Sequence, residues 1–112
     1  MIIFKGSSYS DINLIIDKRL TLISTASTVL QSSSNSPVIT IKGKAASYSI
    51  VMGFKIQGSG DGIVVNDADY VRILNNHVTV DGIGITAYNT KYLNITKNSI
   101  YKNGKCGIVF YS

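Results

Sequence analysis

The sequence predicts an all-β fold: a right-handed, single-stranded parallel β-helix, which is a solenoid of about five coils of roughly 22 residues. Tyr48, Tyr70 and Tyr92 follow one another at one constant interval, and the apolar pattern after each tyrosine repeats as well. The chain has no Glu and is rich in Ile, Val, Ser, Thr, Asn, Gly and Tyr, a composition that disfavours helical repeats. A leucine-rich repeat is also disfavoured, because the internal positions are Ile and Val.

Three short strands are expected in each repeat, because apolar residues alternate over a few positions between Gly, Asn and Asp turns. If the coils stack in parallel, their inward side chains form columns of like residues. The expected columns are Ile63, Ile83 and Ile108 with Val65, Ile85 and Phe110 for the first strand, Val51, Ile73 and Ile95 for the second, and Ile56, Val78 and Ile100 for the third.

The first strand is placed by aligning DGIVV at Asp61 with DGIGI at Asp81, a step slightly shorter than the interval between the tyrosines. This alignment predicts that the turn after the first strand varies in length without disturbing the later columns. It also gives Cys106, which stands before a Gly-Ile pair, the same position as the two aspartates.

The segments GIVVNDADYVRILNNHV and GIGITAYNTKYLNITKNSI resemble the parallel β-helix repeat of the pectin-lyase-like superfamily, in which a Gly-Ile strand and a short turn precede an Ile-x-x-Asn-x-Ile element. Residues 37–43 and 50–58 are similar to a first full coil, and residues 12–24 resemble an opening coil. Within that superfamily, the repeats most resemble those of archaeal and bacterial adhesin-like surface proteins and of the NosD-like group. The resemblance implies an extracellular or cell-surface location, but the scaffold carries lyases, hydrolases, epimerases and non-enzymatic proteins alike.

Asn76 and Asn98 match the asparagine of that element, and Phe54 stands in its place one repeat earlier. We expect the two amides to stack as an inward ladder at the turn before the third strand, bonded to neighbouring coils and to turn backbone. The expected role of both amides is structural, not ligand binding.

The length of 112 residues fits one domain, residues 1–112, and favours a fragment or minimal segment of a longer solenoid. The chain ends at CGIVFYS, where a new first strand has begun without a visible cap, so self-association or further coils are expected. The residues before Lys5 are too few for a signal peptide, and no run approaches the ~18 apolar residues of a membrane span.

The net charge is +5, but the basic residues are spread from Lys5 to Lys105 and only Lys18 and Arg19 are adjacent. No concentrated basic face is expected, and nucleic acid is therefore not an expected partner. An acidic polysaccharide or a negatively charged cell surface stays open as a partner.

No catalytic residue is assigned. Asp61 and Asp81, expected to stack one coil apart, are weak candidates for a calcium site, and ordinary Asp-Gly turn chemistry is the alternative. No other cofactor is expected. Lyases of the resembled superfamily pair a basic residue with acidic residues that hold calcium, and the corresponding residues here are Asp67, Asp69, Arg72 and Lys97.

His77 is the only histidine and is expected on the surface, aligned with Lys55 and Ser99. One imidazole cannot build a zinc or copper site without other soft ligands. Cys106 has no internal disulfide partner, and no triad pattern attaches to it, so a turn role is favoured over a nucleophile.

The tyrosines of the repeating register are expected to point outward or to a corner, as an aromatic stripe with a step of about 4.8 Å. Such a stripe stacks on sugar rings, stabilises the coils on its own account, or does both. The cations expected to flank Tyr48, Tyr70 and Tyr92 are Lys55, Arg72 and Lys91, which suits an acidic or neutral polysaccharide laid along the solenoid.

Three functions follow from these features. The first is a non-catalytic, adhesin-like surface segment that presents a repetitive face to glycans or proteins. The second is a fragment of a polysaccharide-active enzyme of the pectate-lyase kind, which is disfavoured because no long loop walls a cleft. The third is a purely structural segment that assembles end to end.

Overall fold

The structure is a computed structural model that describes residues 1–32 and 34–111. In these residues three parallel sheets, each of five strands, account for the regular structure together with the short 3₁₀ helix η1 (Lys44–Ala46). Sheet A contains β1 (Ile2–Phe4), β4 (Thr21–Ser24), β7 (Ile50–Met52), β10 (Arg72–Leu74) and β13 (Asn94–Thr96). Sheet B contains β2 (Ser8–Tyr9), β5 (Val29–Ser32), β8 (Lys55–Gly58), β11 (His77–Val80) and β14 (Ser99–Ile100). Sheet C contains β3 (Leu14–Ile16), β6 (Ile39–Lys42), β9 (Ile63–Asn66), β12 (Ile85–Tyr88) and β15 (Ile108–Tyr111).

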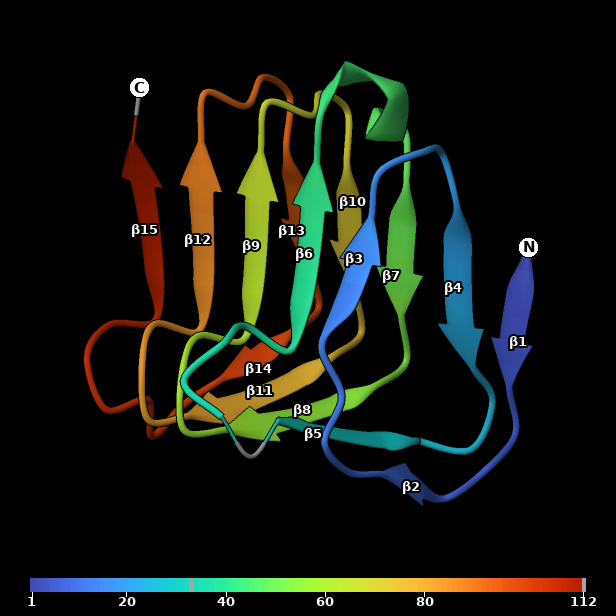
Figure 1. The fold of residues 1–112 in the computed structure, drawn as a ribbon, viewed down its shortest axis with the longest axis vertical. Helices are drawn as coiled ribbons and strands as arrows, with labels where there is room; N and C mark the ends of the chain where they lie inside the picture. The colour runs from blue at the N-terminus through green and yellow to red at the C-terminus, as the bar shows by residue number, and fades with distance from the viewer. Residues whose placement is uncertain (33, 112) are drawn as a thin grey trace.

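The chain visits sheets A, B and C in that order in each of five coils. In Figure 1 the strands of sheet C run upward in front, those of sheet A run downward behind, and the coils advance from the N-terminus on the right to the C-terminus on the left. This winding is right-handed, the sense that parallel crossovers strongly prefer. The predicted parallel β-helix of five coils with three strands each is therefore confirmed. No helix among the described residues is long and apolar enough to cross a membrane.

The coil length is nearly constant in the C-terminal half and variable in the N-terminal half. Val51 and Ile95 both pair with Ile73, at the interval that separates the tyrosines, whereas Leu22 pairs with Val51 across a longer coil. The extra residues lie in the connections, one of which contains η1. Connections run over the surface and tolerate insertions, so the sheets keep their register through both kinds of coil.

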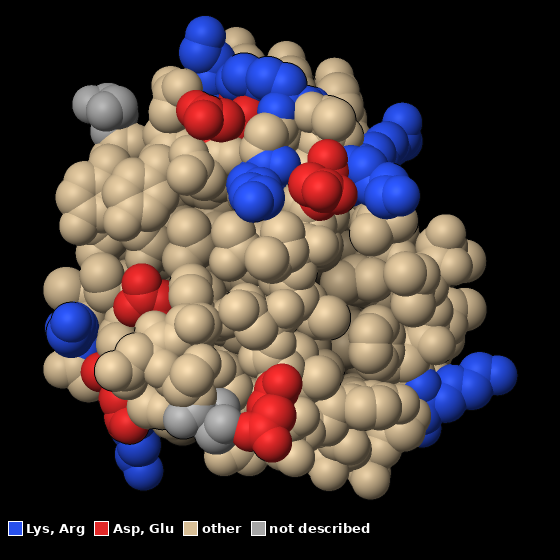
Figure 2. All heavy atoms as spheres, viewed as in Figure 1, with Lys and Arg blue, Asp and Glu red and all other residues tan. Residues whose placement is uncertain are grey.

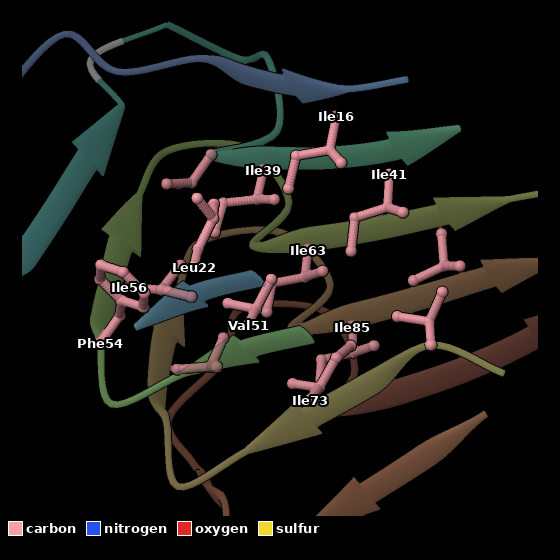
Figure 3. Close-up of a cluster of buried hydrophobic side chains, with 14 of the residues drawn as sticks. Ile16, Leu22, Ile39, Ile41, Val51, Phe54, Ile56, Ile63, Ile73 and Ile85 are labelled. Atoms are coloured by element: carbon pink, nitrogen blue, oxygen red, sulfur yellow. The ribbon is translucent and has the colours of Figure 1, made fainter. Parts of the chain in front are cut away.

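The core is a narrow stack of Ile, Val and Leu side chains inside the three sheets (Figure 3). The second- and third-strand columns match expectation: Val51, Ile73, Ile56 and Val78 are fully buried. Residues of the last coil are covered by a neighbouring coil on one side only, and Ile95 is accordingly half-buried.

The expected first-strand column is wrong in its middle coil. Ile85, not Ile83, pairs with Ile63 and Ile108, and Ala87 takes the place expected for Ile85, between Val65 and Phe110. The segment DGIGI contains two Gly-Ile pairs, and the strand uses the second pair. The step from Ile63 to Ile85 therefore equals the interval between the tyrosines, and the shorter step expected from the aspartates does not occur.

Two of the glycines at this corner are closely packed against the next coil. A Cβ on Gly62 would lie 2.5 Å from the carbonyl oxygen of Gly84, and a Cβ on Gly84 would lie 2.6 Å from the carbonyl oxygen of Gly107. A side chain on Gly62 or Gly84 would therefore collide with the backbone of the next coil, whereas Val38 occupies the same place one coil earlier and a Cβ on Gly107 would make only an ordinary contact at 3.6 Å. The strand pairing places Gly62, Gly84 and Gly107 in register, so Cys106 aligns with Ile83 and Asp61 but not with Asp81.

Asn76 and Asn98 lie one above the other at the corner between sheets A and B. The Asn76 side chain accepts from the backbone N–H of Phe54 (2.9 Å) and donates to the carbonyl of Val51 (3.0 Å). Asn98 repeats the pattern one coil later, accepting from the N–H of Asn76 (2.8 Å) and donating to the carbonyl of Ile73 (2.8 Å). Each amide is thus hydrogen-bonded to the backbone at the corner of the preceding coil. For Asn76, that preceding coil is the one in which Phe54 occupies the asparagine position.

Replacing Ile73 by Asp is expected to unfold the chain. Ile73 is fully buried between Val51 and Ile95, and an unpaired carboxylate there costs several kcal/mol against a marginal total stability. Urea denaturation followed by circular dichroism measures the effect. Gln57→Asp, at an exposed position of β8, is the matched control and should unfold like the wild type. An unchanged curve for Ile73→Asp would contradict the core assignment.

Asn98→Ala is expected to lower the free energy of unfolding by about 1–3 kcal/mol, because it leaves the N–H of Asn76 and the carbonyl of Ile73 without partners. The control is Asn94→Ala, at an exposed position in the same coil, which should change stability by less than about 0.5 kcal/mol. Equal losses for both variants would rule out the structural role of the Asn98 amide.

Candidate functional site

The three tyrosines of the repeating register form a continuous ladder at the corner that leads from sheet C into sheet A. The rings of Tyr48 and Tyr70 stack with centroids 4.8 Å apart and planes 3° apart, and those of Tyr70 and Tyr92 with centroids 4.7 Å apart and planes 13° apart. The three residues are 52%, 43% and 71% exposed, respectively. The ladder is therefore a surface feature with the spacing of the coils.

The backbone at this corner holds the rings in line. All three tyrosines have positive φ, between 57° and 68°, which is an unusual conformation for a bulky residue. It is maintained by bonds between coils: the N–H of Tyr48 donates to the carbonyl of Asp69, and the N–H of Tyr70 donates to the carbonyl of Lys91, both at 2.9 Å. Because these three coils turn in the same way, each ring is placed directly over the next.

Stacking leaves different surfaces open on the three rings. Both faces of Tyr70 are covered, by Tyr48 on one side and by Tyr92 on the other. The Arg19 guanidinium lies 5.6 Å from the centroid of the Tyr48 ring, in the range of a cation–π contact. Tyr92 stacks on Tyr70 alone among the described rings, and it is the most exposed of the three. A flat face for a ligand is consequently offered at Tyr92, and the inner rungs offer ring edges.

The cations expected beside the ladder are not all there. Arg72 lies in β10 on the outside of sheet A, two residues beyond Tyr70, and Lys91 directly precedes Tyr92. Lys55 instead lies in β8 of sheet B, where it pairs with His77. The placement of Lys55 beside the ladder is thus wrong, because a corner separates sheets A and B.

A cleft of about 380 Å³ opens next to the C-terminal end of the ladder, lined by Ala87, Asn89, Thr90, Lys91, Phe110 and Tyr111. It contains part of a second aromatic stack, in which the rings of Tyr88 and Tyr111 have centroids 4.8 Å apart and planes 8° apart. Sequence reasoning missed this pair. The signal was present, since each tyrosine ends a first strand, but the slipped register hid the alignment of Tyr88 with Tyr111.

Asp69 fixes the turn that precedes Tyr70. Its carboxylate accepts from the N–H of Lys91 (3.0 Å) and pairs with the Lys44 ammonium (3.0 Å). These partners, the Lys91 N–H first, hold the pKa of Asp69 below its ordinary value. Asp67, in the same turn, accepts from the side chain of Asn89 at 2.6 Å. Both carboxylates are thus engaged in holding turns together.

The residues considered for lyase chemistry are not brought into one site. Asp67 and Asp69 lie at the corner between sheets C and A, Arg72 lies on the outer face of sheet A, and Lys97 lies at the corner between sheets A and B. In a lyase, the catalytic base and the acidic residues must contact the same substrate molecule. Here the four residues are distributed over three successive parts of the coil.

Asp61 and Asp81 do not stack, which corrects the expectation behind the calcium candidate. Asp61 accepts from the N–H of Ile83 (2.8 Å), and Asp81 donates its own N–H to the carbonyl of Gly58 (2.9 Å), so Asp81 stands earlier in its coil. The cause is again the slipped first-strand register. The Asp61 carboxylate caps the turn of the next coil.

Charge is more segregated than the sequence suggests. All six aspartates lie in the connections on either side of sheet C, at Asp11, Asp61 and Asp81 and at Asp17, Asp67 and Asp69. Sheets A and B and the corner between them contain no acidic residue among the described positions, and they carry Lys5, Lys55, Arg72 and Lys97. The repeat returns aspartates to the same corners, so the acidic residues are confined to the two corners beside sheet C.

A family model described as periplasmic copper-binding protein (NosD) matches residues 9–112. The chain belongs to the NosD family. The NosD-like part of the resemblance is thus confirmed, and the family is a periplasmic one, in agreement with an expected location outside the cytoplasm. No curated protein and no solved structure matches the chain.

The side chains of this NosD-family chain do not fit a copper centre. Copper sites in proteins use His, Cys and Met ligands in close array. Here His77 is exposed on sheet B, Met52 lies on the outside of sheet A, and Cys106 is exposed in the turn before β15. In residues 1–32 and 34–111, no three His, Cys, Asp or Glu side chains are placed to share a metal ion. No copper chemistry is therefore assigned to these residues.

Proposed function

We propose that the chain is a non-catalytic β-helix segment of the periplasm or cell surface that binds polysaccharide at the C-terminal end of its tyrosine ladder. The observation that carries the proposal is the 71% exposed ring of Tyr92, which the rungs behind it hold in place. Because the ring is already ordered, binding to it costs little conformational entropy.

The cleft supplies the remaining features of a sugar site. Lys91 lines it and directly precedes Tyr92, and Asn89 and Thr90 add hydrogen-bonding groups. An aromatic face combined with a small number of polar groups in a concave site is typical of small-molecule and sugar recognition. In this arrangement one sugar ring of the ligand stacks on the exposed face of Tyr92, and the adjoining sugar units lie along the cleft.

This geometry changes how the tyrosines are expected to contribute. Tyr70 belongs to two ring pairs and Tyr92 to one, and each pair contributes about 0.5–1.5 kcal/mol. Tyr70 therefore acts mainly through stability, and Tyr92 through contact with the ligand.

Tyr92→Ser is expected to abolish glycan binding while lowering the free energy of unfolding by only about 0.5–1.5 kcal/mol. A glycan array followed by calorimetry on the best ligand, with calcium and without it, measures binding. Tyr70→Ser should lower stability by about 1–3 kcal/mol and keep binding at temperatures where it is folded. The matched control is Tyr101→Ser, which removes a ring that is 50% exposed at another corner.

Two outcomes would overturn the proposal. A wild-type protein that retains no glycan on the array would leave the ladder as a purely structural element. Turnover of polygalacturonate to unsaturated products that absorb in the ultraviolet would favour the lyase alternative and return attention to Asp67, Asp69, Arg72 and Lys97.

We also propose that the chain associates through its end coils with further coils of the same kind. Phe110 is 65% exposed and Ile108 40% at one end, and Met1 is 80% and Ile2 45% exposed at the other. The strands there have a hydrogen-bonded neighbour on one side only. Sedimentation velocity should show assembly that grows with concentration and weakens in Phe110→Ser. A monodisperse monomer at high concentration would contradict this.

A further inference from the structure

The outer face of sheet A carries an apolar column that the proposed glycan site does not use. It consists of one outward residue from each of the first four coils, paired strand to strand: Ile3, Ile23, Met52 and Leu74. Ile3 is 47% exposed, and the other three are half-buried. Ile50, in the next column, widens the apolar strip.

The charges around this column are cationic. Arg72 lies within the face, between Ile50 and Asn94, and Arg19 lies at the margin over Tyr48. Lys5 and Lys97 lie at the opposite margin, in the connections from sheet A to sheet B. The five strands of sheet A contain no acidic residue, and neither do the described connections that lead from them to sheet B.

Acidic residues are close only at the margin of the tyrosine ladder, and most of them are engaged. Asp69 pairs with Lys44, Asp67 accepts from Asn89, and Asp17 directly precedes Lys18. Sheet A is therefore a strip of apolar residues with aromatic rings along one edge and cations on both sides.

Sheet C has charges of both signs around its outer face. Its outer column is also uncharged, with Ile15, Thr40, Val64 and Thr86 paired in sequence. Acidic side chains lie toward both ends of this face, together with Lys and Arg side chains that gather at its upper end, and its centre is free of charge (Figure 2). Both outer sheet faces thus have an uncharged column, but aspartates lie along both edges of sheet C and along only one edge of sheet A. Sheet C can therefore serve as the control for experiments on sheet A.

The size and charge of the sheet A strip decide which partner fits it. Five strands about 4.8 Å apart, with three residues of about 3.3 Å each, give roughly 200–250 Å², well below the ~800 Å² per partner of a stable protein complex. A second copy would also bring Arg72 against a face that is itself cationic. The aliphatic and thioether side chains of the strip offer neither charge nor hydrogen-bond donors to a sugar or a nucleic acid backbone, whereas such side chains insert between lipid tails.

We propose that the outer face of sheet A docks on an anionic lipid surface. Ile3, Ile23, Met52 and Leu74 enter the boundary between headgroups and acyl chains, and Arg72 with the marginal cations contacts anionic headgroups. Tyr48 and Tyr70 then lie at the level where tyrosine is enriched in membrane proteins. The chain lies on the lipid surface with its solenoid axis parallel to it, and sheet C faces away.

Single tryptophan probes test the orientation directly, because the chain has no Trp. Met52→Trp is compared with Val64→Trp, which places the same probe on the outer face of sheet C. With vesicles of phosphatidylglycerol and phosphatidylcholine in equal parts, the emission of Met52→Trp should shift to shorter wavelength and be quenched by brominated acyl chains. The emission of Val64→Trp should not change. A shift in both or in neither would overturn the proposed orientation.

Cosedimentation with the same vesicles measures affinity. The double variant Ile23→Thr with Met52→Gln should reduce the partition coefficient at least tenfold. Thr is chosen at position 23 because it is β-branched like Ile and therefore suits strand β4. Arg72→Gln should reduce it about fivefold, the effect of one cation near an anionic surface. The matched control, Val64→Thr with Lys42→Gln on sheet C, should bind like the wild type, and all four proteins should have similar melting curves.

Three results would overturn the proposal. The wild type could fail to sediment with anionic vesicles, it could bind equally to phosphatidylcholine alone, or the control could lose as much binding as the sheet A variant. A dimer in lipid-free solution that Met52→Gln dissociates would instead identify the strip as an interface between copies. The glycan array is independent of all these results, so the two proposals fail separately.

Discussion

In-register stacking of the coils is the constraint on which the rest of this structure depends. The neighbour of almost every residue is the residue that occupies the same place one coil away, at the spacing of parallel strands. Val51, Ile73 and Ile95 share a column for this reason, and so do Tyr48, Tyr70 and Tyr92. The apolar core, the asparagine corner and the aromatic ladder are thus three consequences of one hydrogen-bonding register.

The corners make this stacking possible, and they require unusual backbone. Residues with positive φ recur at equivalent places in successive coils, as at Gly53, Asn75 and Lys97 between sheets A and B. Each non-glycine residue in this conformation costs on the order of 1 kcal/mol. The cost is offset because identical corners continue the bonds between coils: the N–H of Gly53 donates to the carbonyl of Leu74, and that of Asn75 donates to the carbonyl of Thr96.

Much of the fold is predictable from the sequence because the repeat period and the apolar pattern carry the same information. The columns led by Val51 and Ile56 follow from that period alone. The first strand was misplaced because DGIGI offers two Gly-Ile pairs, and either pair supplies glycine and isoleucine at the required positions. The hydrophobic pattern does not distinguish the two pairs, and the pairing of Ile85 with Ile63 identifies the second pair as the one in the strand. The surface was less predictable than the core, because it depends on where corners separate residues that are close in the sequence. Lys55 follows Tyr48 closely along the chain, yet a corner places it on a different sheet.

A solenoid of this kind has little interior in which to build a site, since its core is filled by stacked Ile and Val side chains. Whatever distinguishes one such chain from another must therefore lie on its three outer faces and three corners. Here the repeat confines every aspartate to the two corners beside sheet C. Sheet A is left as the face on which apolar residues, tyrosine rings and arginine lie together without an acidic residue among its strands. The same register that fills the core thus gives the molecule two chemically different sides.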